Sequence, residues 1–306
     1  MERVRLMCWC PTCVSGVHLP AFAAAEGGLF ADQGLEVEFV DCARPPDWTL
    51  RGFTARPRAV ATGKADFALS SVAYLLAAQS ESGGRLPVRF VAVSHQRNPI
   101  GGIVRDDSYL CESRDLPGAR TAIWNMPWFT QEYAGALAHL GLGPPALVDT
   151  FEARVALERG DVEVVPAWID MTVELRERCD FPIRTIPLDI DVYATGLIAA
   201  DRLPLELVAR MRDAFVAGYE LQRERPDAGI SAFRHRFPDV PEEQIRANWA
   251  VFEVYAFDGA PPGSMDAERW KATVEYTAAT HGLSPIPPER LYRPELLAPM
   301  PEYAPA

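Results

Sequence analysis

The segment from residue 4 to residue 41 constrains the fold most, because its pattern reads strand, loop, helix, strand. Residues 4–9 form a short apolar stretch that stops at a Cys/Trp/Pro turn, residues 19–30 have a helical pattern that ends at Gly34, and residues 36–41 alternate. This order is typical of the opening βαβ unit of an α/β sheet. In such sheets, small ligands bind where loops meet helix N-termini. We therefore expect a fold that can hold a small molecule.

The alternation of strands and helices continues along the chain in two series. The first series predicts a strand at 66–69, a helix at 71–79 and a strand at 88–94. The second predicts strands at 103–105, 115–124, 162–168, 185–188 and 193–199, with helices at 130–140 and 151–158. After Pro204 the pattern is helical, over 205–225, 228–237, 242–252 and 267–281. The βαβ rhythm predicts a parallel sheet.

Length and charge narrow the class of protein. A chain of 306 residues is long enough for two domains, each with its own apolar core. The net charge of −12 repels duplex nucleic acid and anionic membranes, so we expect neither as a partner. The N-terminus shows no secretory hydrophobic region and the chain has no 18-residue apolar span. We expect a cytoplasmic protein with reduced cysteines; the alternative is an exported one whose leader has been removed.

Three motifs in register carry a family resemblance. They are PAFAAAEGGLFADQGLEV at 20–37, ATGKADFALSS at 61–71 and DLPGARTA at 115–122. Together they make the chain resemble the substrate-binding proteins of nitrate, sulfonate and taurine ABC transporters and the related thiamine-precursor pyrimidine synthases. The resemblance covers most of the chain. It implies a small-molecule ligand and, for an exported protein, an ABC transporter permease as partner.

The resemblance also implies the architecture. It predicts a type II periplasmic-binding-protein fold, in which two α/β lobes joined by two crossover strands close on a ligand in the cleft between them. The first lobe would contain residues 1–99 and 197–306, and the second residues 100–196. The hinges would lie near Gly101 and Gly102 and at residues 194–196.

Several predicted loops face such a cleft. Ser70 and Ser71 lie where a strand meets a helix, so they can hold an anion or simply cap the helix. Trp9 opens the first strand-to-helix loop and is a candidate to stack on a planar ligand; the alternative is a plug over the sheet edge. The remaining candidates are in the second lobe and its return segment, where each can also be a cap or a core residue: Trp124, Asn125, Trp128, Trp168, Asp170, Asp191 and Tyr193.

The three closely spaced thiols of Cys8, Cys10 and Cys13 could converge on a soft metal ion, with His18 as a fourth ligand. A structural zinc site normally combines two separated ligand pairs, and the sequence has no second Cys-x-x-Cys or His-x-x-x-His. Cys8 and Cys10 also share one face of a strand, as core residues do. We therefore favour packing over metal binding.

An enzyme on the same fold is the alternative function. The resembling pyrimidine synthases consume a histidine and hold pyridoxal phosphate through a lysine, whereas the matching positions here are Ser70 and Tyr74. The chain has only two lysines, Lys64 and Lys271, so it offers little scope for a cofactor Schiff base and we expect no cofactor.

A biosynthetic enzyme on this fold would perform elimination, decarboxylation or ring formation, with His18, Asp170 or Asp191 as acid or base. Only His18 and His95 among the histidines are near predicted cleft loops. We favour binding without chemistry, with a small planar organic ligand that can carry an acidic group.

Overall fold

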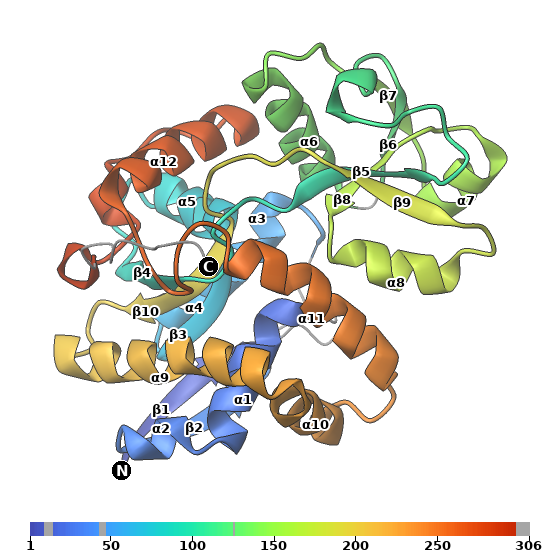
Figure 1. The fold of residues 1–306 in the computed structure, drawn as a ribbon. Coiled ribbons are helices and arrows are strands. Elements are labelled where there is room, and N and C mark those ends of the chain that lie inside the picture. The colour runs from blue at the N-terminus through green and yellow to red at the C-terminus, as the bar shows by residue number, and fades with distance from the viewer. Residues whose placement is uncertain (9–14, 43–46, 125, 298–306) are drawn as a thin grey trace.

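The first lobe is built on one mixed five-stranded sheet. The structure of the protein is a computed structural model, which describes residues 1–8, 15–42, 47–124 and 126–297 of the chain (Figure 1). The strand order is β2-β1-β3-β10-β4. The strands are β1 (Glu2–Met7), β2 (Leu35–Val40), β3 (Phe67–Ser71), β4 (Val88–Val93) and β10 (Thr195–Ala200). β1 is parallel to β2 and β3, but β10 is antiparallel to β3 and β4. The expected parallel sheet is therefore wrong at β10, because this strand returns from the second lobe instead of following a βαβ crossover.

Helices cover both faces of this sheet, and the C-terminal third of the chain supplies the longest of them. They are α1 (Leu19–Glu26), α2 (Leu29–Asp32), α3 (Leu50–Phe53), α4 (Ala55–Ala61), α5 (Val72–Glu81), α9 (Leu205–Glu224), α10 (Pro226–Arg236), α11 (Glu242–Ala256) and α12 (Ala267–His281). The single helix expected at 19–30 is divided, because Gly28 adopts φ 73°. Helix α1 packs against α9 and α10, which bury its apolar residues.

The second lobe has two smaller sheets. One has the order β8-β5-β9, all antiparallel, and the other pairs β6 with β7 in parallel. Its strands are β5 (Ile100–Arg105), β6 (Arg120–Ile123), β7 (Ala146–Asp149), β8 (Val165–Trp168) and β9 (Ile183–Pro187). Its helices are α6 (Pro127–His139), α7 (Ala153–Arg159) and α8 (Met171–Arg178). Short 3-10 turns complete the chain: η1 (Gly16–His18), η2 (Ser113–Asp115), η3 (Pro288–Arg290) and η4 (Pro294–Leu296).

Two segments connect the lobes, at residues 94–99 and 188–194, and they lie side by side. Asn98 and Ile190 form an isolated antiparallel bridge between them. The glycines expected at the hinges instead lie within strands, Gly101 and Gly102 in β5 and Gly196 in β10. A Cβ atom on Gly101 would come within 2.7 Å of a backbone oxygen, and one on Gly196 within 2.2 Å. These glycines therefore allow neighbouring strands to pack more closely than a residue with a side chain would permit.

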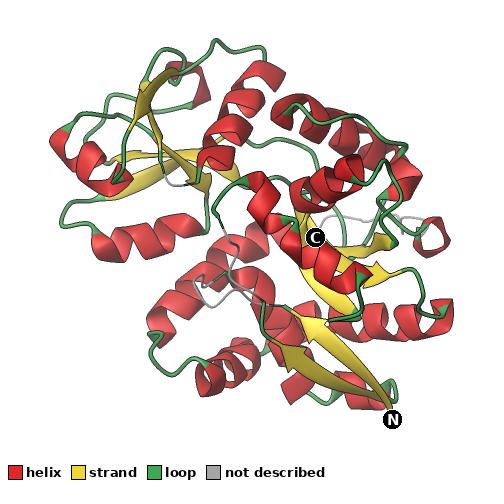
Figure 2. Cartoon of the chain, turned by 180° about the vertical axis from the view of Figure 1, so that it is seen from behind, coloured by secondary structure: helices red, strands yellow, loops and turns green. Residues whose placement is uncertain are grey.

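The two lobes, seen from behind in Figure 2, are in contact through two helix pairs. Helix α6 packs against α12, and α8 packs against α11. The first contact is close, because a Cβ atom on Gly135 would lie 2.5 Å from the Thr280 side chain. In the described residues, no helix has the length and apolar character needed to cross a membrane.

Candidate functional site

A cluster of rings lies between the two lobes, beside helix α11 of the first lobe. Trp168 ends β8 of the second lobe, and its ring centroid is 5.8 Å from that of His95, which follows β4. Phe252 and Tyr255 of α11 approach the same imidazole, with centroids at 4.7 Å and 6.5 Å. The order of the elements explains this meeting, since the carboxyl ends of β4 and β8 both point toward the gap between the lobes. We call these four rings the interlobe ring cluster.

Two buried polar side chains, His95 of this cluster and the nearby Asp170, each keep one atom without a hydrogen bond in the described structure. Asp170, which precedes α8, accepts a 2.6 Å hydrogen bond from Ser15 Oγ at its Oδ2. Its Oδ1 is buried, and no described residue bonds to it. The Nδ1 atom of His95 lies 2.5 Å from Thr195 Oγ1, while its Nε2 has no partner within the described chain. Asp170 is 5% exposed and His95 is 1% exposed, so neither free atom is satisfied by bulk water.

Burial sets the protonation of both groups. It raises the pKa of Asp170, and the Ser15 hydroxyl and the adjacent backbone amides of Asp170 and Met171 oppose that rise. It lowers the pKa of His95 to about 3, so this imidazole is neutral at pH 7. A buried polar atom without a hydrogen bond costs about 1–3 kcal/mol. The interlobe centre therefore has a carboxyl oxygen and a neutral imidazole nitrogen available for a polar group placed between the rings.

Glu132 of α6 orients the tryptophan of the cluster. Its Oε2 accepts a 3.1 Å hydrogen bond from Trp168 Nε1, and its Oε1 accepts a 2.7 Å bond from Asn98 Nδ2. Burial is the largest influence on this carboxyl and raises its pKa to about 7, although both hydrogen bonds act in the opposite direction. One side chain thus links the interlobe ring cluster to a crossover segment.

Trp124, just before α6, and Trp128, in its first turn, are both predicted as site residues, and their surroundings differ from each other. Trp128 is 2% exposed and packs edge-on against Phe53 and Tyr74 of the first lobe, at centroid distances of 6.0 Å and 5.5 Å. Trp124 is half-buried, stacks on Phe129 at 6.1 Å and donates from Nε1 to the Pro166 oxygen. Trp128 is therefore part of the packing between the lobes, and Trp124 is the one with ring surface still exposed. Asn125 lies outside the described residues.

The predicted anion site at Ser70 and Ser71 is largely satisfied within the protein. Both side chains are buried. Ser71 caps α5 by accepting a hydrogen bond from the Ala73 amide at 3.2 Å, and the Val72 amide donates to the Ala194 oxygen at 2.8 Å. The N-terminus of α5 therefore has little donor capacity left for an anion.

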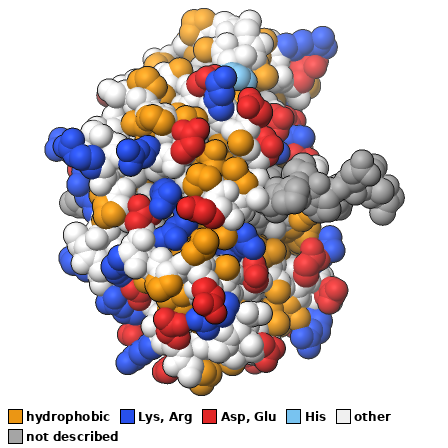
Figure 3. Space-filling model, turned by 90° about the vertical axis from the view of Figure 1, so that its left-hand side faces the viewer, with side chains coloured by type: hydrophobic (Ala, Val, Ile, Leu, Met, Phe, Trp, Pro, Cys, Tyr) orange, Lys and Arg blue, Asp and Glu red, His pale blue; other side chains and the backbone are white. Residues whose placement is uncertain are grey.

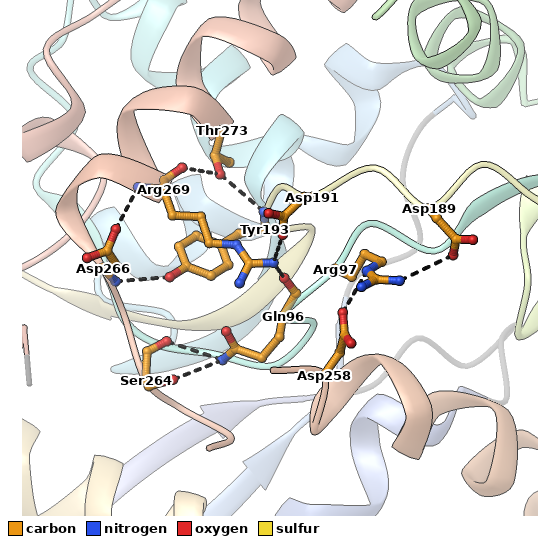
Figure 4. A network of polar contacts seen from close by, with 10 residues as sticks. All are labelled: Gln96, Arg97, Asp189, Asp191, Tyr193, Asp258, Ser264, Asp266, Arg269 and Thr273. Carbon is orange, nitrogen blue, oxygen red and sulfur yellow. Dashed lines mark hydrogen bonds and ion pairs between the residues drawn. The ribbon is translucent and has the colours of Figure 1, made fainter. Parts of the chain in front are cut away.

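Asp191 and Tyr193 belong to a polar network on the crossover, shown in Figure 4. Asp191 is exposed and pairs with Arg269 of α12, which also donates to the Gln96 oxygen. The Tyr193 hydroxyl accepts from the Asp266 amide at 2.9 Å. These contacts tie the crossover to α12 of the first lobe, so the structure does not bring either residue to the interlobe ring cluster.

The predicted metal and acid–base residues near β1 are only partly described. Trp9, Cys10 and Cys13 lie outside the described residues. Cys8 and His18 are buried, and burial lowers the pKa of His18 to about 3, with Arg56 nearby acting in the same direction. Within the described part of the chain, no group of three or more His, Cys, Asp or Glu side chains could hold a metal ion.

The four described cysteines, Cys8, Cys42, Cys111 and Cys179, form no disulfide with one another.

Comparison with known proteins agrees with this architecture. The family described as NMT1/THI5 like matches residues 15–229. No curated protein is significantly similar to the chain. The similar solved structures include the periplasmic aliphatic sulphonate binding protein SsuA from Escherichia coli (15% identity, 92% of this chain, 87% of that chain, TM-score 0.65) and the putative periplasmic sulfonate-binding protein SsuA from Methylobacillus flagellatus KT (17% identity, 97% of this chain, 92% of that chain, TM-score 0.67).

A mutant of the desulfurization enzyme DszB, in complex with biphenyl-2-sulfinic acid, is also similar, at 16% identity over 96% of this chain and 97% of that chain, with a TM-score of 0.59. Sequence identities this low show a shared fold and not a shared ligand. The expected type II periplasmic-binding-protein-like fold, with two α/β lobes, is confirmed.

Proposed function

Because this chain belongs to the NMT1/THI5-like family, we propose that it binds a small organic molecule with a flat apolar body between its lobes, without chemical change. The observation that carries this proposal is the interlobe ring cluster with its two unsatisfied polar atoms, Asp170 Oδ1 and His95 Nε2. Flat rings are favourable neighbours for a planar ligand, and a few convergent polar atoms orient it.

The similar structures support the same kind of function. SsuA is named a sulfonate-binding protein, and the DszB structure contains biphenyl-2-sulfinic acid. The same fold therefore holds small organic molecules in proteins of two different activities. Asp170 and His95 are buried, so ligand entry in this chain requires the lobes to separate.

The direct test is native mass spectrometry of the freshly purified full chain. We expect a small molecule to be retained, and to be lost in Trp168→Ala. Glu206→Gln changes an exposed side chain on α9 and is the matched control, which should retain the molecule. Equal retention by Trp168→Ala and wild type would contradict binding at the interlobe ring cluster.

We further propose export and delivery of the ligand to an ABC permease. This rests on the two similar sulfonate-binding proteins, both named periplasmic. Sequencing the N-terminus of the chain isolated from its native cells tests it. A processed or lipidated terminus in an extracytoplasmic fraction supports the receptor role, and a cytoplasmic chain starting at Met1 contradicts it.

A second candidate is an enzyme on the same fold. The specific observation in its favour is the neutral imidazole of His95, whose Nε2 is unpartnered in the described structure. Because burial lowers the pKa of His95 to about 3, this imidazole is a weak base at pH 7, and its role in an enzyme would be to accept a hydrogen bond that orients the substrate. If the molecule released from the protein gains a new mass on incubation with wild type and not with His95→Gln, the enzyme is supported and binding without chemistry is contradicted.

A further inference from the structure

We propose that the ligand held at the interlobe ring cluster carries a cationic nitrogen group, an amine or an amidine, which lies against Asp170. This inference rests on the proposed function and adds the chemical class of the ligand. It differs from the anionic ligands of the similar structures, a sulfonate-binding protein and a complex with a sulfinic acid.

The first support is the state of the Asp170 carboxyl. A carboxylate only accepts hydrogen bonds; Ser15 donates to Oδ2 of Asp170, and the adjacent backbone amides of Asp170 and Met171 also favour its charged form. The other oxygen, Oδ1, is buried and has no partner in the described structure. A buried carboxylate is stable when it is paired, and an ammonium or amidinium group supplies both the N–H donor and the opposite charge. A sulfonate supplies neither.

The rings around Asp170 support the same choice. Asp170 is close enough to Tyr255 to contribute to the raised pKa of that hydroxyl, behind the larger effect of burial. It follows Trp168 by two residues in the chain. Asp170 therefore lies in the neighbourhood of two aromatic side chains, a type of residue whose ring faces attract positive charge. When Nδ1–H of His95 donates to Thr195, the neutral Nε2 of His95 is one more acceptor.

The two arginines of the crossover network are already paired with carboxylates. Arg97, the arginine that influences Tyr255, already pairs with Asp258 at 2.6 Å and with Asp189 at 3.6 Å (Figure 4). Arg269 pairs with Asp191 in the neighbouring network. An incoming anion would have to compete with these carboxylates. The chain as a whole carries a net charge of −12, and acidic and basic groups are intermingled on the face shown in Figure 3. The long-range field thus attracts cations.

The test compares flat probes that differ in the charge of one group. Benzylamine and benzamidine are cations at pH 7.5, benzenesulfonate is an anion, and benzamide is neutral. Isothermal titration calorimetry with the full-length chain should give affinities at least about tenfold higher for a cation than for benzenesulfonate. Asp170→Asn should lower the affinity for the cations by about tenfold or more and leave benzamide within about twofold. Asp180→Asn, an exposed aspartate of the same lobe, is the matched control and should change neither affinity.

Two results overturn the inference. The first is binding of benzenesulfonate as tight as that of the cations, which leaves the proposed interlobe function standing. The second is failure of both cations to bind at about 10 mM. In that case a molecule retained in native mass spectrometry still supports the proposed function and shows that only its class was wrong. The comparison among probes on wild type decides the matter even where Asp170→Asn does not fold.

Discussion

Glu132→Gln should remove a pH dependence of stability that comes from one buried carboxyl. The pKa of Glu132 is raised from 4.5 to about 7 in the folded protein, mainly by burial. The folded chain therefore holds this proton more tightly than the unfolded chain does. Stability contributed by the protonated form is fully present below pH 4.5 and is lost as pH rises toward 7. At about 1.4 kcal/mol per pKa unit, the loss is about 3 kcal/mol.

The amide that Glu132→Gln introduces does not titrate, but it carries its own cost. Both partners of the Glu132 carboxyl are donors, Asn98 Nδ2 and Trp168 Nε1. In the variant, the amide nitrogen must face one of them, which costs about 1–3 kcal/mol at every pH. We therefore expect the variant to be less stable than wild type at pH 4.5. The difference should shrink by about 3 kcal/mol as pH rises to 7, and then stay constant.

Urea unfolding followed by tryptophan fluorescence, at several pH values from 4.5 to 8, measures this difference. Because other groups titrate in both proteins, only the difference between wild type and variant is diagnostic. Glu206→Gln changes an exposed glutamate and should follow the wild-type curve throughout. Parallel curves for wild type and Glu132→Gln would refute the reasoning, because they would mean that Glu132 titrates alike in the folded and unfolded chains.

Three shorter predictions concern the site itself. Trp124→Ala should weaken binding of the retained ligand at least about tenfold without unfolding the protein, since its half-buried ring has exposed surface; unchanged calorimetric affinity would remove it from the site. Ser15→Ala should favour the open form, because it removes the bond to Asp170, worth about 1.5–3 kcal/mol for a charged acceptor; an unchanged radius of gyration in X-ray scattering would contradict this. Metal analysis of tag-free protein should find substoichiometric zinc and iron; one equivalent, lost in Cys10→Ser, would reverse our view of the cysteine cluster.

Much of the fold could be predicted because the buried residues of a helix or strand recur at regular spacings in the sequence. The helix expected at 205–225 is observed at Leu205–Glu224, since its buried residues recur every three to four positions along one face. Helix α8 was not predicted, because the sequence of Met171–Arg178 is polar and only Thr172 and Val173 are buried. Strand β7 was missed for a similar reason, since it is short and largely exposed.

The candidate site was harder to predict, because its members come from distant parts of the chain. Trp168 and Asp170 are expected at the cleft from the sequence, since they end and follow a predicted strand, and the structure places Trp168 at the end of β8. Glu132 was not, although it carries a readable signal: it lies four residues after Trp128 and four before Ala136, on the buried face of α6. An acidic residue within an apolar stripe needs buried hydrogen-bond partners. The sequence does not say that these partners would be Asn98 and Trp168.

The placement of Glu132 connects ligand contact with lobe closure. Trp168, one wall of the interlobe ring cluster, and Asn98, on a crossover segment, are held by the same carboxyl group. Asn98 also donates from its backbone amide to the Ile190 oxygen of the other crossover segment at 3.1 Å. Glu132 and Trp168 belong to the second lobe and Asn98 to a crossover segment, so the bond from Asn98 is the one that rotation of the lobes about these segments would change. Under the proposed function, we expect a ligand that stacks on Trp168 and also contacts α11 of the first lobe to bind the closed form better than the open one. That difference in affinity is what shifts the equilibrium toward closure.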